Sequence, residues 1–181
     1  MVKRDFMSVF RRMLMPRPVV LVTTIDRDGR PNIMSAAWIT PVSSAPPLIA
    51  ISIAPNRYSH SLIKENGEFV VNIPSRVLVK EVEYCGHVSG KNLDKFKAAK
   101  LTAEPAKRVK PPIIKECVGH LECRMVNSVA AGDHTVFIGE VLAAYADGSL
   151  FSEKSWNLEK AKVLQHLTSD FYSTPGKSFQ A

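Results

Sequence analysis

Cysteine is scarce in this sequence: there are three, at positions 85, 117 and 123, and none of them belongs to a CxxC pair. Zinc knuckles and thioredoxin-type redox sites need closely spaced cysteines, so both classes are disfavoured. Cys117 and Cys123 are expected on one face of a strand, where six residues span roughly 20 Å, too far for a disulfide. We therefore expect buried thiols.

Several other signals are missing. No apolar run is long enough to span a membrane, and the basic residues in 1–17 are not followed by the core of a signal peptide, so we expect a cytoplasmic protein without membrane contact. GxGxxG, GxxxxGK[ST], HExxH and GxSxG are absent. The histidines show no ligand-like spacing, which argues against a metal site; they stand at positions 60, 87, 120, 134 and 166.

The composition that remains is that of one ordinary globular domain, 1–181, with 45% hydrophobic and 23% charged residues. The net charge of +7 is compatible with nucleic acid, an anionic membrane or a small phosphorylated ligand as partner. It is equally compatible with simple solubility.

Apolar periodicity predicts strands joined in hairpins. The expected strands are 18–25, 32–40, 48–54, 68–73, 117–125 and 134–146. Short helices are expected at 59–66, ending at Gly67, and at 76–84. Apolar residues between 6 and 14 predict an amphipathic helix packed on the body, and the basic, proline-rich segment 91–116 reads as an exposed excursion. The pattern indicates an antiparallel barrel with helical insertions.

The stretch "APNRYSHS", residues 54–61, places an arginine and two serines where a helix begins. Free N–H groups and the helix dipole favour an anion there, and an arginine fork suits a phosphate. The alternative is structural: Ser59 caps the helix and Arg57 is merely solvated.

Three further segments carry both a structural and a functional interpretation. The small residues 35–37, between Asn32 and Trp38, allow a flat ring to lie on a strand, or else pack against a helix. His134 follows a Gly-Asp turn at the start of a strand, where it lines a pocket or stays on the surface. The loop 85–96, with Lys91, is a ligand loop or an ordinary basic loop.

Taken in this order, the segments 18–74, 85–96 and 132–148 resemble the flavin reductase-like, FMN-binding split-barrel family, and its flavoredoxin-type branch in particular. The resemblance implies a mainly β fold: a six-stranded antiparallel split barrel of Greek-key type with short helical insertions. It also implies a homodimer with FMN near the dimer interface.

The resemblance also assigns residues. Arg57 and Ser59 would hold the FMN phosphate, residues 35–38 would run beside the ribityl chain and ring, and His134, in the family's GDH motif, would lie where a nicotinamide stacks. The cofactor-binding set implied is Asn32, Ser35, Ala36, Ala37, Trp38, Ser52, Arg57, Ser59, His60, Asn72, Ser89, Gly90 and Lys91.

The leading functional hypothesis is an FMN-dependent oxidoreductase that accepts hydride from NADH or NADPH and reduces a flavin, a ferric chelate or a redox partner. Such a protein supplies position and electrostatics around the flavin, so it needs no acid–base pair of its own. The alternative is an FMN electron carrier with little NAD(P)H turnover. A nucleic-acid-binding barrel is a third possibility, but the aromatic residues are not interleaved with Lys and Arg as a stacking platform requires.

Overall fold

A computed structural model describes residues 3–179. The helical elements are η1 (Met7–Leu14), α1 (Tyr58–Asn66), η2 (Arg76–Leu78), α2 (Val79–His87), α3 (Lys95–Ala98) and α4 (Leu158–Ala161). The strands are β1 (Arg17–Pro18), β2 (Val20–Ile25), β3 (Pro31–Ala36), β4 (Ile39–Ser43), β5 (Leu48–Ile53), β6 (Glu68–Ile73), β7 (Ala103–Glu104), β8 (Ile113–Ile114), β9 (Gly119–Ala131), β10 (His134–Ala146), β11 (Gln165–Thr168) and β12 (Phe171–Ser173). Across residues 3–179, no helix combines the length and apolar character needed to cross a membrane.

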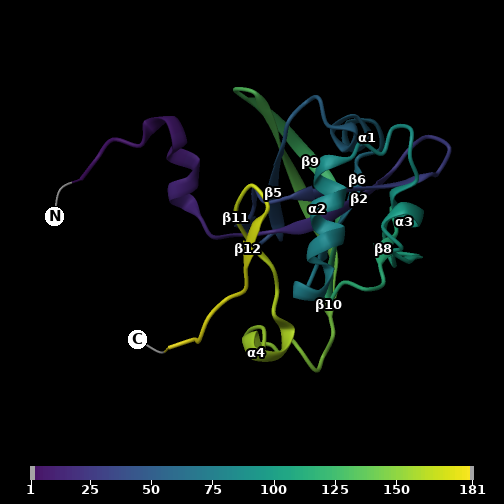
Figure 1. The fold of residues 1–181 in the computed structure, drawn as a ribbon. Coiled ribbons are helices and arrows are strands. Elements are labelled where there is room, and N and C mark those ends of the chain that lie inside the picture. The colour runs from purple at the N-terminus through teal and green to yellow at the C-terminus, as the bar shows by residue number, and fades with distance from the viewer. Residues whose placement is uncertain (1–2, 180–181) are drawn as a thin grey trace.

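The main sheet has seven antiparallel strands in the order β3-β2-β6-β9-β10-β5-β4 (Figure 1). Its edge strands, β3 and β4, are separated in the chain only by Ala37 and Trp38, so the sheet must curl until its two edges nearly meet. The predicted mainly β, split-barrel class is confirmed. The predicted number of six strands is corrected to seven, because the segment expected as one strand over 32–40 is divided at this corner.

The strand β2 is buried on both faces because the molecule has two apolar cores. Val20 and Val22 face the barrel interior with Phe69 and Phe137. Leu21 faces a second core, in which α2 and α3 cover the outer side of β2 and β3. The site described below lies near the β3 side of this second layer.

The helix α1 follows β5 and ends as the sequence predicted. Gly67 has φ of 70°, a left-handed conformation that glycine adopts without steric cost, and its N–H donates to the carbonyl of Ile63. The helix begins at Tyr58, one residue before the predicted start. Its first turn therefore sits directly after the β5 end that contributes to the site.

Three sequence predictions need correction. The excursion 91–116 is not outside the core, since Leu101, Val109 and Ile114 are buried. The helix η1 does not pack on the body, because it has no buried residue and Met7 and Met13 are 75% and 72% exposed. Cys117 precedes β9 rather than sharing a strand face with Cys123. All three cysteines are free and buried, which confirms the prediction of buried thiols at Cys117 and Cys123.

Candidate functional site

Two hollows meet at Ser35 and Arg57. The inner chamber, of about 100 Å³, lies among β3, the first turn of α1 and the chain from Cys85 to Gly90. The outer chamber, of about 490 Å³, lies among the β3–β4 corner, the start of β10, the segment 11–17 and β11. Because Ser35 and Arg57 line both, one elongated ligand can occupy the two chambers together.

Arg57 stands at the entrance of the inner chamber as the N-cap residue of α1. Its Nη1 donates to the carbonyl of Gly86 at 3.2 Å, which points the guanidinium across the chamber. Among residues 3–179, no side chain caps the helix start, so its first N–H groups remain available for an anion. The structural alternative, a cap by Ser59, is not what the structure shows: Ser59 is buried and its Oγ bonds to Asn32.

Asn32 and Gly90 fit closely against each other at the floor of the inner chamber. The Asn32 Nδ2 donates to Ser59 Oγ at 2.7 Å, while its Oδ1 is buried without a hydrogen-bond partner in the described chain. A Cβ atom on Gly90 would lie 1.9 Å from this oxygen, so only glycine allows the loop to approach. The loop 89–90 is thereby held beside the start of α1.

Lys95 is a charged residue of the inner chamber that sequence reasoning missed. It is only 3% exposed, and its Nζ donates to the carbonyls of Ile33 at 2.7 Å and Cys85 at 2.8 Å. Burial lowers the pKa of Lys95, the Cys85 side chain opposes that shift, and the charge of Arg57 lowers it further. An ammonium group buried between two neutral carbonyls and a second cation favours an anionic ligand.

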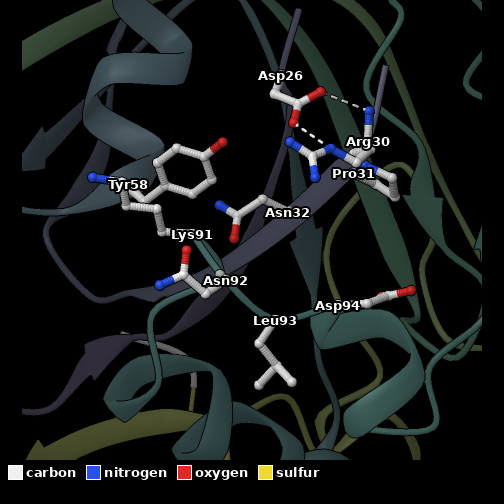
Figure 2. Close-up of a pocket in the computed structure, with 10 residues that line it drawn as sticks. Asp26, Arg30, Pro31, Asn32, Tyr58, Lys91, Asn92, Leu93 and Asp94 are labelled. Atoms are coloured by element: carbon white, nitrogen blue, oxygen red, sulfur yellow. Dashed lines mark hydrogen bonds and ion pairs between the residues drawn. The ribbon is translucent and has the colours of Figure 1, made fainter. Parts of the chain in front are cut away.

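Lys91 and Ser89 lie on either side of this loop. Ser89 lines the inner chamber, whereas Lys91 lines a third hollow of about 470 Å³ on the far side of Asn32 and Gly90. Figure 2 shows that hollow, with the Asp26–Arg30 pair at its rim; Arg30 Nε donates to Asp26 Oδ2 at 2.8 Å. Those two charges neutralise each other, so this hollow has less electrostatic attraction for an anion than the inner chamber.

The outer chamber contains an aromatic pair. Trp38 and His134 stack with ring centroids 4.6 Å apart and planes 22° apart. The His134 Nδ1 lies 2.7 Å from Asp133 Oδ1, which fixes the imidazole in place. The Ser52 N–H donates to the Trp38 carbonyl at 2.9 Å and anchors the β3–β4 corner. The predicted residues Ser35, Ala36, Ala37, Trp38, Ser52 and His134 all line this chamber.

His60 and Asn72 are predicted site residues that the structure does not bring to either chamber. The His60 Nε2 lies 2.9 Å from Thr135 Oγ1, and its ring packs edge-on against Phe137 inside the barrel. The Asn72 amide donates to the Leu21 carbonyl at 3.0 Å, and its Oδ1 accepts from His120 and from a backbone N–H. The His60 Nε2 is thus bonded to the barrel strand β10, whereas the Asn72 side chain lies on the outer face of β6 and joins the main sheet to β8.

The outer chamber also includes residues from both ends of the chain, which sequence reasoning did not place there. They are Arg11, Arg12, Met15 and Arg17 before β2, and His166, Thr168 and Ser169 in the tail. β1 pairs with β11, with Arg17 opposite His166. A two-residue strand leaves too little periodicity to be recognised in the sequence.

The family model for the flavin reductase like domain matches residues 10–172. The chain belongs to this family. The solved structure of the flavoredoxin of Desulfovibrio vulgaris (Miyazaki F) is 35% identical, with a TM-score of 0.84 over 92% of this chain and 91% of that one. A flavoredoxin from Methanosarcina acetivorans is 30% identical, with a TM-score of 0.87 over 100% and 95% of the two chains. The flavin reductase (NADH) of Kitasatospora aureofaciens is 34% identical over 76% of this chain and 69% of its own.

These likenesses confirm the family indicated by the sequence motifs. The two chambers are compatible with this family, because together they suit a ligand with an anionic end and a flat end.

Proposed function

We propose that the protein is an FMN-dependent oxidoreductase that accepts hydride from NADH or NADPH and passes electrons to a flavin, a ferric chelate or a redox partner. The observation that carries this proposal is the inner chamber, where an uncapped helix start, Arg57 and the buried Lys95 converge beside an opening large enough for a flat ring. The flavoredoxin and flavin reductase relatives support it.

The inner chamber fits the phosphate of FMN. A phosphate monoester carries nearly two negative charges at neutral pH and three strong acceptor oxygens. Arg57 and the first N–H groups of α1 supply donors, Lys95 supplies a buried positive charge, and Ser59, Ser89, Gly90 and Asn32 shape the chamber. Lys91 adds positive potential from the neighbouring hollow.

The outer chamber fits the flavin ring and its partner. The small side chains of Ser35, Ala36 and Ala37 let a flat ring approach β3, with the corner held by the bond between Ser52 and Trp38. FMN, when bound, supplies the hydride acceptor, so the protein's own groups bind, orient and exclude water. The bond of His134 to Asp133 and its stacking on Trp38 support a role for this imidazole in positioning a nicotinamide.

Reduction by nucleotide tests the proposal. The FMN-loaded protein is expected to be reduced by NADPH or NADH in anaerobic stopped-flow experiments, and His134→Ala is expected to slow this on the order of 100-fold, because hydride transfer depends steeply on ring placement. Reduction by dithionite, which needs no nicotinamide, should be equal in both proteins. Equal nucleotide-driven rates in the two proteins would remove His134 from the reaction.

A second candidate function is an FMN electron carrier, which the likeness to two flavoredoxins favours. In that case the wild-type protein is reduced by dithionite but by neither nucleotide.

A cytoplasmic homodimer belongs to either proposal. Val126 and Val129 on β9 are 51% and 53% exposed, as expected for apolar side chains that a second subunit covers.

A further inference from the structure

Three arginines line the outer chamber close to the Trp38–His134 pair. Arg11 and Arg12 come from the last turn of η1, and Arg17 forms β1. Over residues 3–179, none of the three forms an ion pair with a carboxylate. The N-terminal segment therefore gives this chamber a wall with three positive charges that no carboxylate neutralises within residues 3–179.

The charges of Arg11 and Arg17 are close enough to repel each other. The pKa of Arg17 is lowered by partial burial and by the charge of Arg11. The carboxylate of Asp133 interacts electrostatically with Arg11, but its Oδ1 is already bonded to His134. An anion among the arginines would reduce this repulsion, because it is attracted to all three.

Arg17 connects this wall to the proposed nicotinamide position. Its guanidinium carbon lies 5.5 Å from the centre of the Trp38 ring, a cation–π contact, and the Trp38 ring also stacks on His134. Arg17 and His134 thus share the Trp38 ring as a contact, and Arg11 and Arg12 line the same chamber. This arrangement suits a ligand with a flat ring at one end and phosphate groups further along.

We propose that Arg11, Arg12 and Arg17 bind the phosphate groups of the nicotinamide dinucleotide, and that they select NADPH over NADH through its additional 2′-phosphate. This assignment rests on the proposed oxidoreductase function. The 2′-phosphate adds close to two negative charges, which three arginines that form no ion pair within residues 3–179 are suited to neutralise. The binding site is distinct from the inner chamber, where Arg57 and Lys95 face the FMN phosphate.

The test uses fragments that lack the nicotinamide, so that binding is measured apart from reduction. Calorimetry of the FMN-loaded protein with 2′,5′-ADP and with 5′-AMP should show at least about tenfold tighter binding of 2′,5′-ADP, as charge-assisted bonds to one further phosphate give. The double substitution Arg11→Gln/Arg12→Gln should abolish most of that preference. The matched control is Lys3→Gln/Arg4→Gln, which removes two charges from the same segment outside the chamber and should keep it.

Two outcomes of the calorimetry would overturn the proposal: equal affinity for the two fragments in the wild-type protein, or the same loss in the control as in the Arg11→Gln/Arg12→Gln variant. Failure of the oxidoreductase function has a different signature. If neither nucleotide reduces the flavin but 2′,5′-ADP binds in an Arg11- and Arg12-dependent manner, the anion site stands and the protein's reaction is reassigned. If NADPH and NADH both reduce the flavin with equal half-saturating concentrations, the reaction stands and the arginine selectivity is rejected.

Discussion

At the scale of single residues, the inner chamber uses two cations in different ways. Arg57 is exposed, and its guanidinium reaches across the chamber to the Gly86 carbonyl. The Lys95 ammonium group is buried and is fixed by hydrogen bonds to two backbone carbonyls. Arg57 can therefore form directed bonds with a phosphate, whereas Lys95 contributes mainly potential and shape.

This difference makes Arg57 the sharper site for a mutational test. Arg57→Ala is expected to weaken FMN binding by about 1.5–3 kcal/mol, the range for a hydrogen bond to a charged group. Riboflavin has no phosphate, so its affinity should change little. Titration of the flavin fluorescence with each protein measures both. Equal losses for FMN and riboflavin would show that Arg57 does not contact the phosphate, and Arg57→Lys should recover part of the FMN affinity.

At the scale of elements, one buried carboxylate joins the excursion before β8 to the main sheet. Glu122 on β9 is fully buried and accepts the Lys107 N–H at 2.9 Å and the Tyr145 hydroxyl at 2.8 Å. Burial raises the pKa of Glu122, but these bonds outweigh it and the net shift is downward. The basic segment is thus held on the barrel by its own backbone rather than left in solvent.

Glu122→Gln should loosen this segment. A glutamine turns one acceptor into a donor facing other donors, so the free energy of unfolding is expected to fall by about 2–4 kcal/mol, as for other disrupted buried networks. Urea unfolding gives the loss, and hydrogen exchange should localise it to residues 105–113. Glu116→Gln is the control, since Glu116 accepts the Thr102 N–H from a less buried place and should cost under about 1 kcal/mol. Similar losses for the two variants would contradict the bridging role of Glu122.

At the scale of the whole molecule, His120 makes stability depend on pH. Burial lowers its pKa to about 4, with Glu122 and Glu104 opposing the shift and Lys107 adding to it, and its Nδ1 faces Asn72 Oδ1 at 2.9 Å. The unfolded chain therefore binds this proton more readily than the folded one between pH 6.5 and about 4. Stability contributed by neutral His120 is complete above pH 6.5 and is lost as the pH falls through that window.

The expected loss is on the order of 3 kcal/mol at the lower end of the window, the free energy equivalent of that pKa difference. Denaturant unfolding at several pH values measures it. In His120→Asn, whose amide can replace the Nδ1 donor but does not titrate, the slope over this window should be much smaller. An unchanged slope would show that other groups produce the pH dependence.

A feature could be predicted from the sequence when the residues that form it are neighbours in the chain. The strands of the main sheet were predicted because alternating side chains leave a local pattern, as in the β10 segment 134–146. The inner chamber was predicted in part, because Arg57 and the start of α1 are neighbours in the chain. Lys95 was not, because a lysine in a basic loop looks the same whether it is solvated or buried.

Other contributions depend on contacts between distant parts of the chain. His60 and Asn72 lie close in the chain to Arg57 and Ser59, yet packing bonds the His60 ring to Thr135 and joins the Asn72 amide to β2 and β8. The apolar residues of η1 form a helical pattern, but within residues 3–179 they cover no surface and stay exposed. Periodicity reports which side of an element is apolar; it does not report what that side meets.

The pairing of Arg17 with His166 has a consequence for the order of events during synthesis. Arg17 emerges from the ribosome long before His166, so β1 has no partner strand while most of the barrel is being synthesised. The wall of the outer chamber is complete only when nearly the whole chain has emerged. The cofactor is therefore expected to load onto a finished polypeptide, and a chain stopped before β11 would leave the ribosome with its inner chamber built and its outer chamber open.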